Sequence, residues 1–242
     1  MEVSVKLSAP IYVLKKKAKE LKRLEGISLN EALDKVAKIE GFSSWSLLAS
    51  KSGEVFPRNQ NEILGFLNEG DLMLLAARPG HGKTRFALEL LVQGMKESRQ
   101  CFFFSLEYTF KDVLSKVADI DESVGGNNEF LHFDFSDEIS SQYIISKASP
   151  GSLVAIDYLQ LLDQKRSLPS LQTQVEELKR FAMDKSCTLI FISQVDREAD
   201  GREPGLSDIR LPNELDLGLF NKVFFIHDGR KYFARPEVPG YL

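Results

Sequence analysis

The residues best suited to chemistry form a glycine-rich segment, AARPGHGKT, at positions 76–84. It follows the apolar run LMLLAA and precedes a helical pattern, so it predicts a loop between a strand and a helix. Such a loop directs backbone N–H groups and the positive end of the helix dipole at one point, which suits phosphate oxygens. Ala77 replaces the first glycine of the phosphate-loop pattern G-x-x-x-x-G-K-[ST], which leaves an ordinary turn with a chance GKT as the alternative. We expect phosphate contacts from Pro79, Gly80, His81, Gly82, Lys83, Thr84 and Arg85.

Two residues of the loop and three residues at the ends of other apolar runs are expected to act together at this site. In the loop, we expect the Lys83 ammonium to contact the outer phosphates and the Thr84 hydroxyl to ligate Mg²⁺. Asp157 ends LVAID and is expected to hold Mg²⁺ through water. Glu107 closes CFFFSLE, where it could polarise an attacking water, and Gln194 ends TLIFISQ, where its amide could sense the terminal phosphate. The alternative for Asp157 is a strand-end aspartate that begins a turn, and the alternative for Glu107 is an exposed turn glutamate.

The elements that must position these residues alternate along the chain. Runs that are apolar at every residue are typical of strands buried on both faces of a parallel sheet, and helical patterns separate them. Repeated strand-helix alternation predicts a layered α/β domain with right-handed crossovers. The expected helices cover about 83–97, 110–118, 138–148 and 170–185. Asp228-Gly229, between two strand-like runs near the end, predicts a hairpin turn.

A different pattern precedes this alternation. Apolar residues recur at helical spacing from Ile11, Gly26 offers a stop, and Ser28 with Glu31 predicts a capping box that opens a second helix. A third short helix is expected to carry Trp45. The polar, Gly-, Pro- and Asn-containing stretch that follows has the composition of a linker. We therefore predict a small helical module over 1–50, a linker over 51–61 and one α/β domain over 62–242.

Composition excludes several classes of protein. The 242 residues carry 31 Lys and Arg against 35 Asp and Glu, a net charge of -4, so the chain is not a globally basic nucleic-acid binder. No apolar run approaches the ~20 residues of a membrane helix, and the first residues lack a secretory pattern, so we expect a cytoplasmic protein. Cys101 and Cys187 each open an apolar run and are expected to be reduced core residues. The three histidines, His81, His132 and His227, are too few and too scattered in sequence to suggest a zinc site.

Several segments together resemble the motor domain of the DnaB family of replicative helicases. They are AARPGHGKT, FFFSLE, AIDYLQLL, ISQVDR and SDIR, and the resemblance covers about residues 60–228. It implies a RecA-like fold with a mainly parallel central sheet and flanking helices, ATP with Mg²⁺, a homo-oligomeric ring and single-stranded DNA in a central channel. It also implies that Glu107 activates water and that Gln194 contacts the terminal phosphate.

The chain departs from that family pattern in two respects. The module at 11–49 replaces the family's helical amino-terminal domain. The Lys-x-Arg pair that the family sends into a neighbouring ATP site has no counterpart at the family spacing, although Arg230, Lys231 and Arg235 lie in about the right place. Because a supplied arginine can accelerate phosphoryl transfer by about 1000-fold, its loss predicts a slow ATPase rather than a motor. A mixed ring with a full-length helicase could supply the missing arginine.

Two loops are the candidates for contact with single-stranded DNA, DQKRSLP at 163–169 and VDREADGREPGLSDIR at 195–210. The cations available there are Lys165, Arg166, Arg197, Arg202 and Arg210. The second loop carries five acids against three arginines, which predicts weak, salt-sensitive binding, or a solvated loop at a subunit interface. The basic helix at 14–23 offers another cationic face, with its apolar positions expected to face a partner.

The leading hypothesis is therefore a DnaB-like ATPase that acts on or near single-stranded DNA. One alternative is a nucleotide-switched interaction protein or accessory ATPase without unwinding activity, in which the small module holds a partner. The other is a small-molecule phosphotransferase. The sequence disfavours it because we find no arginine-rich lid and because Glu107 is placed to activate water.

Overall fold

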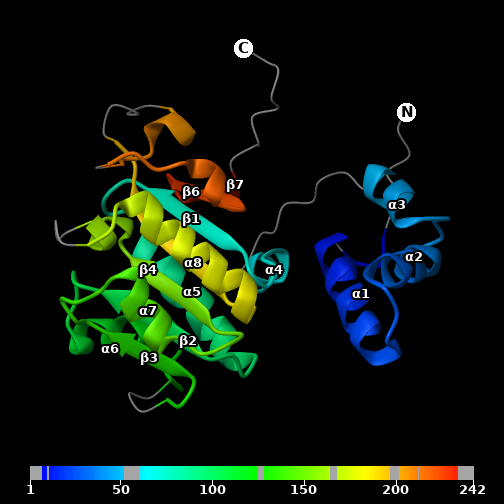
Figure 1. Cartoon of the computed structure of the whole chain (residues 1–242), viewed down its shortest axis with the longest axis horizontal. Helices are drawn as coiled ribbons and strands as arrows, with labels where there is room; N and C mark the ends of the chain where they lie inside the picture. Colours follow the sequence, from blue (N-terminus) through cyan, green and yellow to red (C-terminus); the bar gives the residue numbers. More distant parts are fainter. Residues whose placement is uncertain are drawn as a thin grey trace. The chain divides into compact units, whose positions relative to one another are not determined.

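The structure is a computed structural model, and it describes residues 7–9, 11–51, 60–124, 128–163, 168–196, 202–211 and 213–233. The chain divides into two compact units, residues 1–66 and 67–242 (Figure 1). Most of the predicted linker, residues 52–59, lies outside the described residues.

The first unit is helical: α1 (Ile11–Glu25), α2 (Leu29–Ile39), α3 (Trp45–Lys51) and α4 (Gln60–Phe66). The predicted capping box is present, because the Ser28 hydroxyl accepts from the Glu31 N–H while the Glu31 carboxylate accepts from the Ser28 N–H. Leu14 and Ala18 of the basic helix α1 are buried in the core of the unit itself, with residues of α2 and α3, so these two positions do not face a partner as expected.

The second unit is built on a seven-stranded sheet with the order β3-β2-β4-β5-β1-β6-β7. All neighbours are parallel except β6 and β7, which form the predicted hairpin around Asp228 and Gly229. The mainly parallel sheet of the sequence prediction is thus confirmed. The strands are β1 (Leu72–Ala77), β2 (Cys101–Ser105), β3 (Leu131–Asp134), β4 (Leu153–Asp157), β5 (Thr188–Gln194), β6 (Lys222–His227) and β7 (Arg230–Phe233).

Helices cover both faces of this sheet. On β4, Leu153 lies against Gly94 of α5, whereas Val154 belongs to the core cluster that includes residues of α7 and α8. Because successive strand residues point to opposite faces, α5 covers one face and α7 with α8 cover the other (Figure 1). The helices are α5 (Lys83–Lys96), α6 (Phe110–Ala118), α7 (Ser141–Lys147) and α8 (Leu171–Lys185), with short 3-10 turns η1 (Leu159–Asp163), η3 (Leu206–Asp208) and η4 (Leu217–Leu219).

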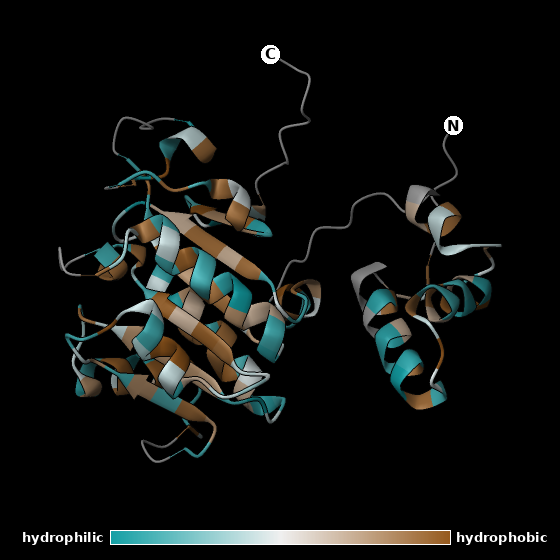
Figure 2. Cartoon of the chain, viewed as in Figure 1, coloured by the Kyte–Doolittle hydropathy of each residue, from teal (hydrophilic) through white to brown (hydrophobic). Residues whose placement is uncertain are grey.

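Hydropathy explains this layering. Figure 2 shows central strands that are largely hydrophobic, whereas the covering helices carry hydrophilic residues as well. Every residue of β1 and β4 is buried, as expected for strands covered on both faces. Cys101 and Cys187 are buried free thiols in this interior, and burial raises the pKa of Cys101 to about 12. None of the described helices is both long and apolar enough to cross a membrane.

Strand register brings the predicted site residues to one edge. Ser105 pairs with Asp157, Asp157 pairs with Ile192, and Ala77 pairs with Gln194. The carboxyl ends of β2, β4, β5 and β1 therefore meet at the same edge, which is where open α/β sheets bind ligands.

Candidate functional site

The glycine-rich loop joins β1 to α5 as predicted. Gly80 and Gly82 have φ values of +80° and +81°, a region that residues with a Cβ rarely adopt. The loop closes on itself where the His81 N–H donates to the Arg78 carbonyl over 3.2 Å. Gly82 is the N-cap of α5 and supplies no side-chain acceptor, so the N–H groups of the first helical turn are left for an anion.

Two side chains at the start of α5 point into the same edge. The Lys83 ammonium donates to the Arg78 carbonyl over 3.1 Å. The Thr84 hydroxyl donates to a carboxylate oxygen of Asp157 over 2.7 Å, which joins the loop to the end of β4. The phosphate loop and the carboxylate at the end of β4 therefore lie side by side, as the sequence predicts.

Charge at this edge is poorly solvated. Asp157 is only 1% exposed, and burial raises its pKa to about 6, opposed by the Thr84 hydrogen bond. Burial likewise lowers the pKa of Lys83, although the carboxylates of Asp157 and Glu107 favour its charged form. A buried carboxylate and a hydroxyl are oxygen ligands of the kind that Mg²⁺ takes, so the residues present fit that ion.

Glu107 and Gln194 flank this pair. The Glu107 N–H donates to the Ser105 hydroxyl over 3.1 Å, and its charge acts on both Asp157 and Lys83. Gln194 ends β5, and its backbone carbonyl accepts a hydrogen bond from the backbone N–H of Arg210 over 2.8 Å. The end of β5 is thus hydrogen-bonded to the returning arm of the loop at 195–210.

Other predicted residues have neighbours within the chain. The Arg85 guanidinium lies 3.1 Å from the Glu89 carboxylate, one helical turn further along α5. Arg230 lies 2.8 Å from Glu203, and the Lys231 ammonium lies 4.3 Å from the centre of the Phe86 ring. The third candidate for the supplied cation, Arg235, lies outside the described residues.

Tyr108 is a polar residue at this edge that was not among the predicted site residues. The Tyr108 hydroxyl lies 3.5 Å from the Thr84 hydroxyl. Its position directly after Glu107 was the available signal, because that residue also follows the end of β2 at this edge.

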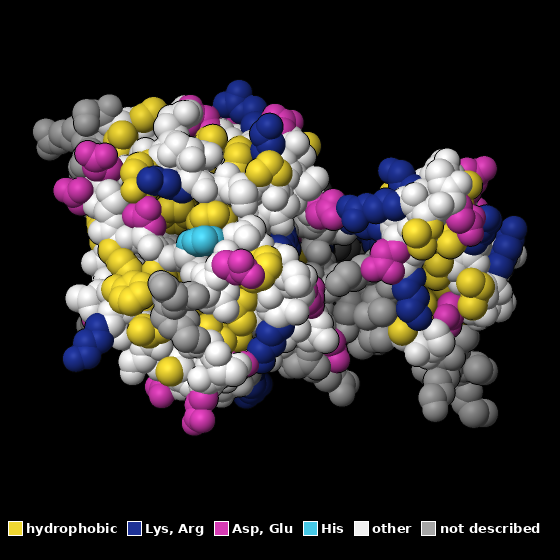
Figure 3. Space-filling view, turned by 90° about the horizontal axis from the view of Figure 1, so that it is seen from below, with side chains coloured by type: hydrophobic (Ala, Val, Ile, Leu, Met, Phe, Trp, Pro, Cys, Tyr) yellow, Lys and Arg dark blue, Asp and Glu magenta, His cyan; other side chains and the backbone are white. Residues whose placement is uncertain are grey.

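The two predicted DNA loops are described only in part, because 164–167 and 197–201 lie outside the described residues. Arg202 makes a two-pronged contact with Asp208, at 2.7 and 2.6 Å, so its charge is engaged inside the loop. Figure 3 views the chain from below, the side away from β6 and β7, and cationic and anionic side chains are interspersed on that face. The engagement of Arg202 by Asp208 does not favour strong tracking of a phosphate backbone.

Comparisons with known proteins identify the family of this chain. The family model described as the DnaB-like helicase C terminal domain matches residues 58–134 and 136–233, more than half of the chain. The replicative DNA helicase DnaB of Mycoplasma pneumoniae is 28% identical over 203 residues, covering 66% of this chain and 43% of its own. A probable plasmid replicative DNA helicase of Chlamydia psittaci is 25% identical over 215 residues, covering 72% of this chain and 46% of its own.

Solved structures share the fold. One solved ATPase domain matches with a TM-score of 0.55 and 23% identity, over 82% of each chain. A DnaB-like replicative helicase, solved to study its interactions with primase, matches with a TM-score of 0.55 and 20% identity, over 88% of this chain and 64% of its own. The chain spans less than half the length of the curated relatives above. The layered unit is therefore RecA-like, and the chain belongs to the family of DnaB-like helicase C-terminal domains.

Proposed function

We propose that this chain binds and hydrolyses ATP and acts on or near single-stranded DNA in replication or a related DNA transaction. The observation that carries the proposal is the meeting of the phosphate loop with Asp157 through the 2.7 Å hydrogen bond from Thr84, beside Lys83 and Glu107. A strand, a glycine-rich loop and a helix start that meet a buried carboxylate form the arrangement of phosphate-loop NTP hydrolases.

Each residue has a distinct role in the proposal. Backbone N–H groups of 80–85 and the Lys83 ammonium bind the phosphates. Thr84 and Asp157 hold Mg²⁺, which neutralises phosphate charge when bound. Glu107 accepts a proton from the attacking water, and Gln194 senses the terminal phosphate. The hydrogen bond between Gln194 and Arg210 supports a relay from that sensor into the loop at 195–210.

DNA contact and assembly are the finer parts of the proposal. The names of the curated relatives are those of replicative DNA helicases, which supports a role near DNA. A homo-oligomeric ring, or a mixed ring with a full-length helicase, is part of the same proposal. With Arg202 held by Asp208, we expect DNA affinity to be weak for one chain and to rise with assembly.

One observation favours the accessory alternative, a nucleotide-switched ATPase without unwinding activity. Arg230 is paired with Glu203, and Lys231 lies over Phe86 and 4.0 Å from Glu89. A cation bound within its own subunit does not reach a neighbouring ATP. The Arg230–Glu203 pair is exposed on both sides and thus weak, so ring assembly could still release it.

The test is steady-state ATP hydrolysis by the full chain with and without single-stranded DNA, beside a mass measurement with ATP and Mg²⁺. Turnover that DNA stimulates in a ring supports the motor, and slow turnover in a monomer, indifferent to DNA, supports the accessory function. Lys83→Ala should abolish ATP binding. Lys96→Ala, in the last turn of the same helix and paired with Asp121, is the matched control and should bind normally. Equal ATP binding by both variants would overturn the nucleotide site.

A further inference from the structure

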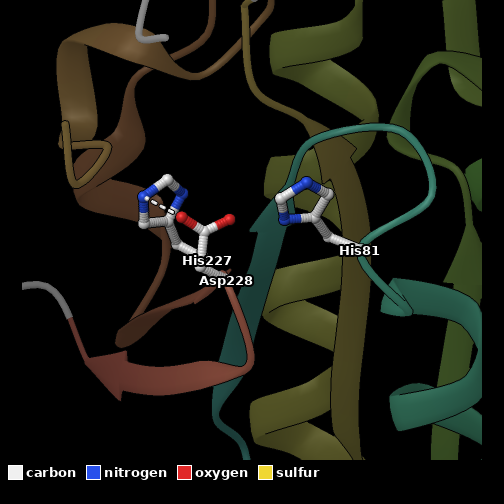
Figure 4. A group of neighbouring side chains, drawn as sticks. All are labelled: His81, His227 and Asp228. Atoms are coloured by element: carbon white, nitrogen blue, oxygen red, sulfur yellow. Dashed lines mark ion pairs between the residues drawn. The ribbon is translucent and has the colours of Figure 1, made fainter. Parts of the chain in front are cut away.

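Three side chains that can bind a metal come together at the margin of the site described above. His81 belongs to the phosphate loop after β1, whereas His227 ends β6 and Asp228 begins the turn to β7. One ligand atom from each lies within 4.8 Å of the others. The two imidazole rings are nearly parallel with centres 6.2 Å apart, and an Asp228 oxygen lies 3.4 Å from His227 Nε2. Figure 4 shows the carboxylate between the two rings in that view.

Strand pairing explains this meeting of residues about 146 positions apart in the chain. Ala77 at the end of β1 pairs in parallel with Ile226 near the end of β6. The loop that leaves β1 and the turn that leaves β6 therefore start side by side at the carboxyl edge. Asp157 is on β4, which β5 and β1 separate from β6, so this cluster is distinct from the pair expected to hold Mg²⁺.

The burial of His227 is a second, independent observation. His227 is only 6% exposed, yet its Nδ1 atom has no hydrogen-bond partner among the described residues. Buried side-chain nitrogens are nearly always paired, because an unpaired one loses its bonds to water without replacement. The cluster therefore contains a buried nitrogen whose hydrogen-bonding capacity is unused.

We propose that His81, His227 and Asp228 form a binding site for a divalent transition metal of the zinc class. Two imidazole nitrogens and one carboxylate oxygen are ligands that Zn²⁺ takes, whereas Mg²⁺ prefers oxygen ligands alone. Three protein ligands leave a fourth position for water or another oxygen ligand. A metal bound here ties the phosphate loop to the hairpin turn.

The geometry requires only a small closure. Ligand atoms around a tetrahedral Zn²⁺ lie about 3.4 Å apart, so the cluster must contract by roughly 1.5 Å. His81 is partly exposed in a loop, and the Asp228 side chain is 69% exposed in a tight turn. Both side chains can rotate toward His227, which the backbone of β6 holds in place.

The chain provides its own control for the experiment, because it contains three histidines and His132 is on β3, at the opposite edge of the sheet. The metal-free full chain is titrated with Zn²⁺ by calorimetry, in excess Mg²⁺ and without nucleotide, whose phosphates would compete for zinc. We expect one Zn²⁺ per chain. His81→Ala, His227→Ala and Asp228→Asn should each weaken binding about tenfold or more, and His132→Ala should leave it unchanged.

The proposal is overturned if the wild-type chain binds no zinc at micromolar concentrations, if His81→Ala binds as the wild type does, or if His132→Ala removes the binding. Because His81 is partly exposed, His81→Ala should fold normally. It therefore tests the proposal even if His227→Ala, which removes a buried side chain, fails to fold. Co²⁺ bound in place of Zn²⁺ adds an independent readout. Its visible absorption should report four-coordinate geometry in the wild type and should be lost in His81→Ala. None of these measurements depends on ATP hydrolysis.

Discussion

Above pH 6 the buried carboxylate of Asp157 is ionised, and this buried charge lowers the stability of the metal-free protein. Replacing Asp157 with Asn should remove this cost in stability. The pKa of Asp157 rises from 3.8 to about 6 because the side chain is 1% exposed. The folded protein thus binds a proton more tightly than the unfolded chain does, and stability falls as pH rises from about 4 to 6. At pH 8 the ionised group costs about 3 kcal/mol relative to a neutral one.

The amide of Asn retains an acceptor for the Thr84 hydroxyl but adds an N–H₂ group that needs partners, which offsets part of the gain. We therefore expect Asp157→Asn to stabilise the metal-free protein by about 1–2 kcal/mol at pH 8. The difference between the two pH values is more informative, because the packing of Asn cancels in it. Asp157→Asn should gain on the order of 1 kcal/mol more over the wild type at pH 8 than at pH 5, since about half of the penalty persists at pH 5.

The assay is urea unfolding at both pH values, followed by far-UV circular dichroism. Tryptophan fluorescence does not serve, because the chain has one tryptophan, Trp45, and it belongs to the helical unit. Asp137→Asn, at an exposed carboxylate, is the matched control and should show no such pH-dependent gain. A free-energy difference between variant and wild type that is equal at pH 8 and pH 5 would refute the assignment of a costly buried charge. The same variant should lose ATP hydrolysis, which makes this carboxylate a site where function opposes stability.

Two further predictions concern the packing of α5 on the sheet and the hydrogen bonds of Arg99. Phe86 is 2% exposed and stacks on Phe224 at 5.2 Å, so Phe86→Ala should cost about 3–5 kcal/mol in urea unfolding. Phe86→Leu should recover most of that loss, and equal losses for both would contradict the cavity explanation. Arg99 donates to the carbonyls of Gly151 and Ser152 and to the Thr188 hydroxyl at the opposite edge. Arg99→Met should cost about 2–3 kcal/mol in thermal unfolding, and an unchanged melting temperature would show that those groups find other donors.

Much of the local structure follows from patterns that act over a few residues. The boundaries expected for α5, α6 and α8 agree with the structure to within one residue, because helical periodicity and the caps at Thr109 and Ser170 depend on neighbours in sequence. The helix α4 over Gln60–Phe66 was not predicted. A helix of two turns has little intrinsic stability, so tertiary packing rather than periodicity decides whether it forms.

The sequence by itself determined the alternation of strands and helices, the phosphate loop and the order of Glu107, Asp157 and Gln194 along the chain. Because parallel strands present their carboxyl ends at one edge, that order was enough to predict which residues meet there. Only the tertiary structure decided how deeply Asp157 is buried, that Arg230 pairs with Glu203, and that His81 lies beside His227. Those features depend on strand order and on contacts between segments far apart in sequence. The parallel pairing of β1 with β6, which local periodicity does not encode, brings two scattered histidines together.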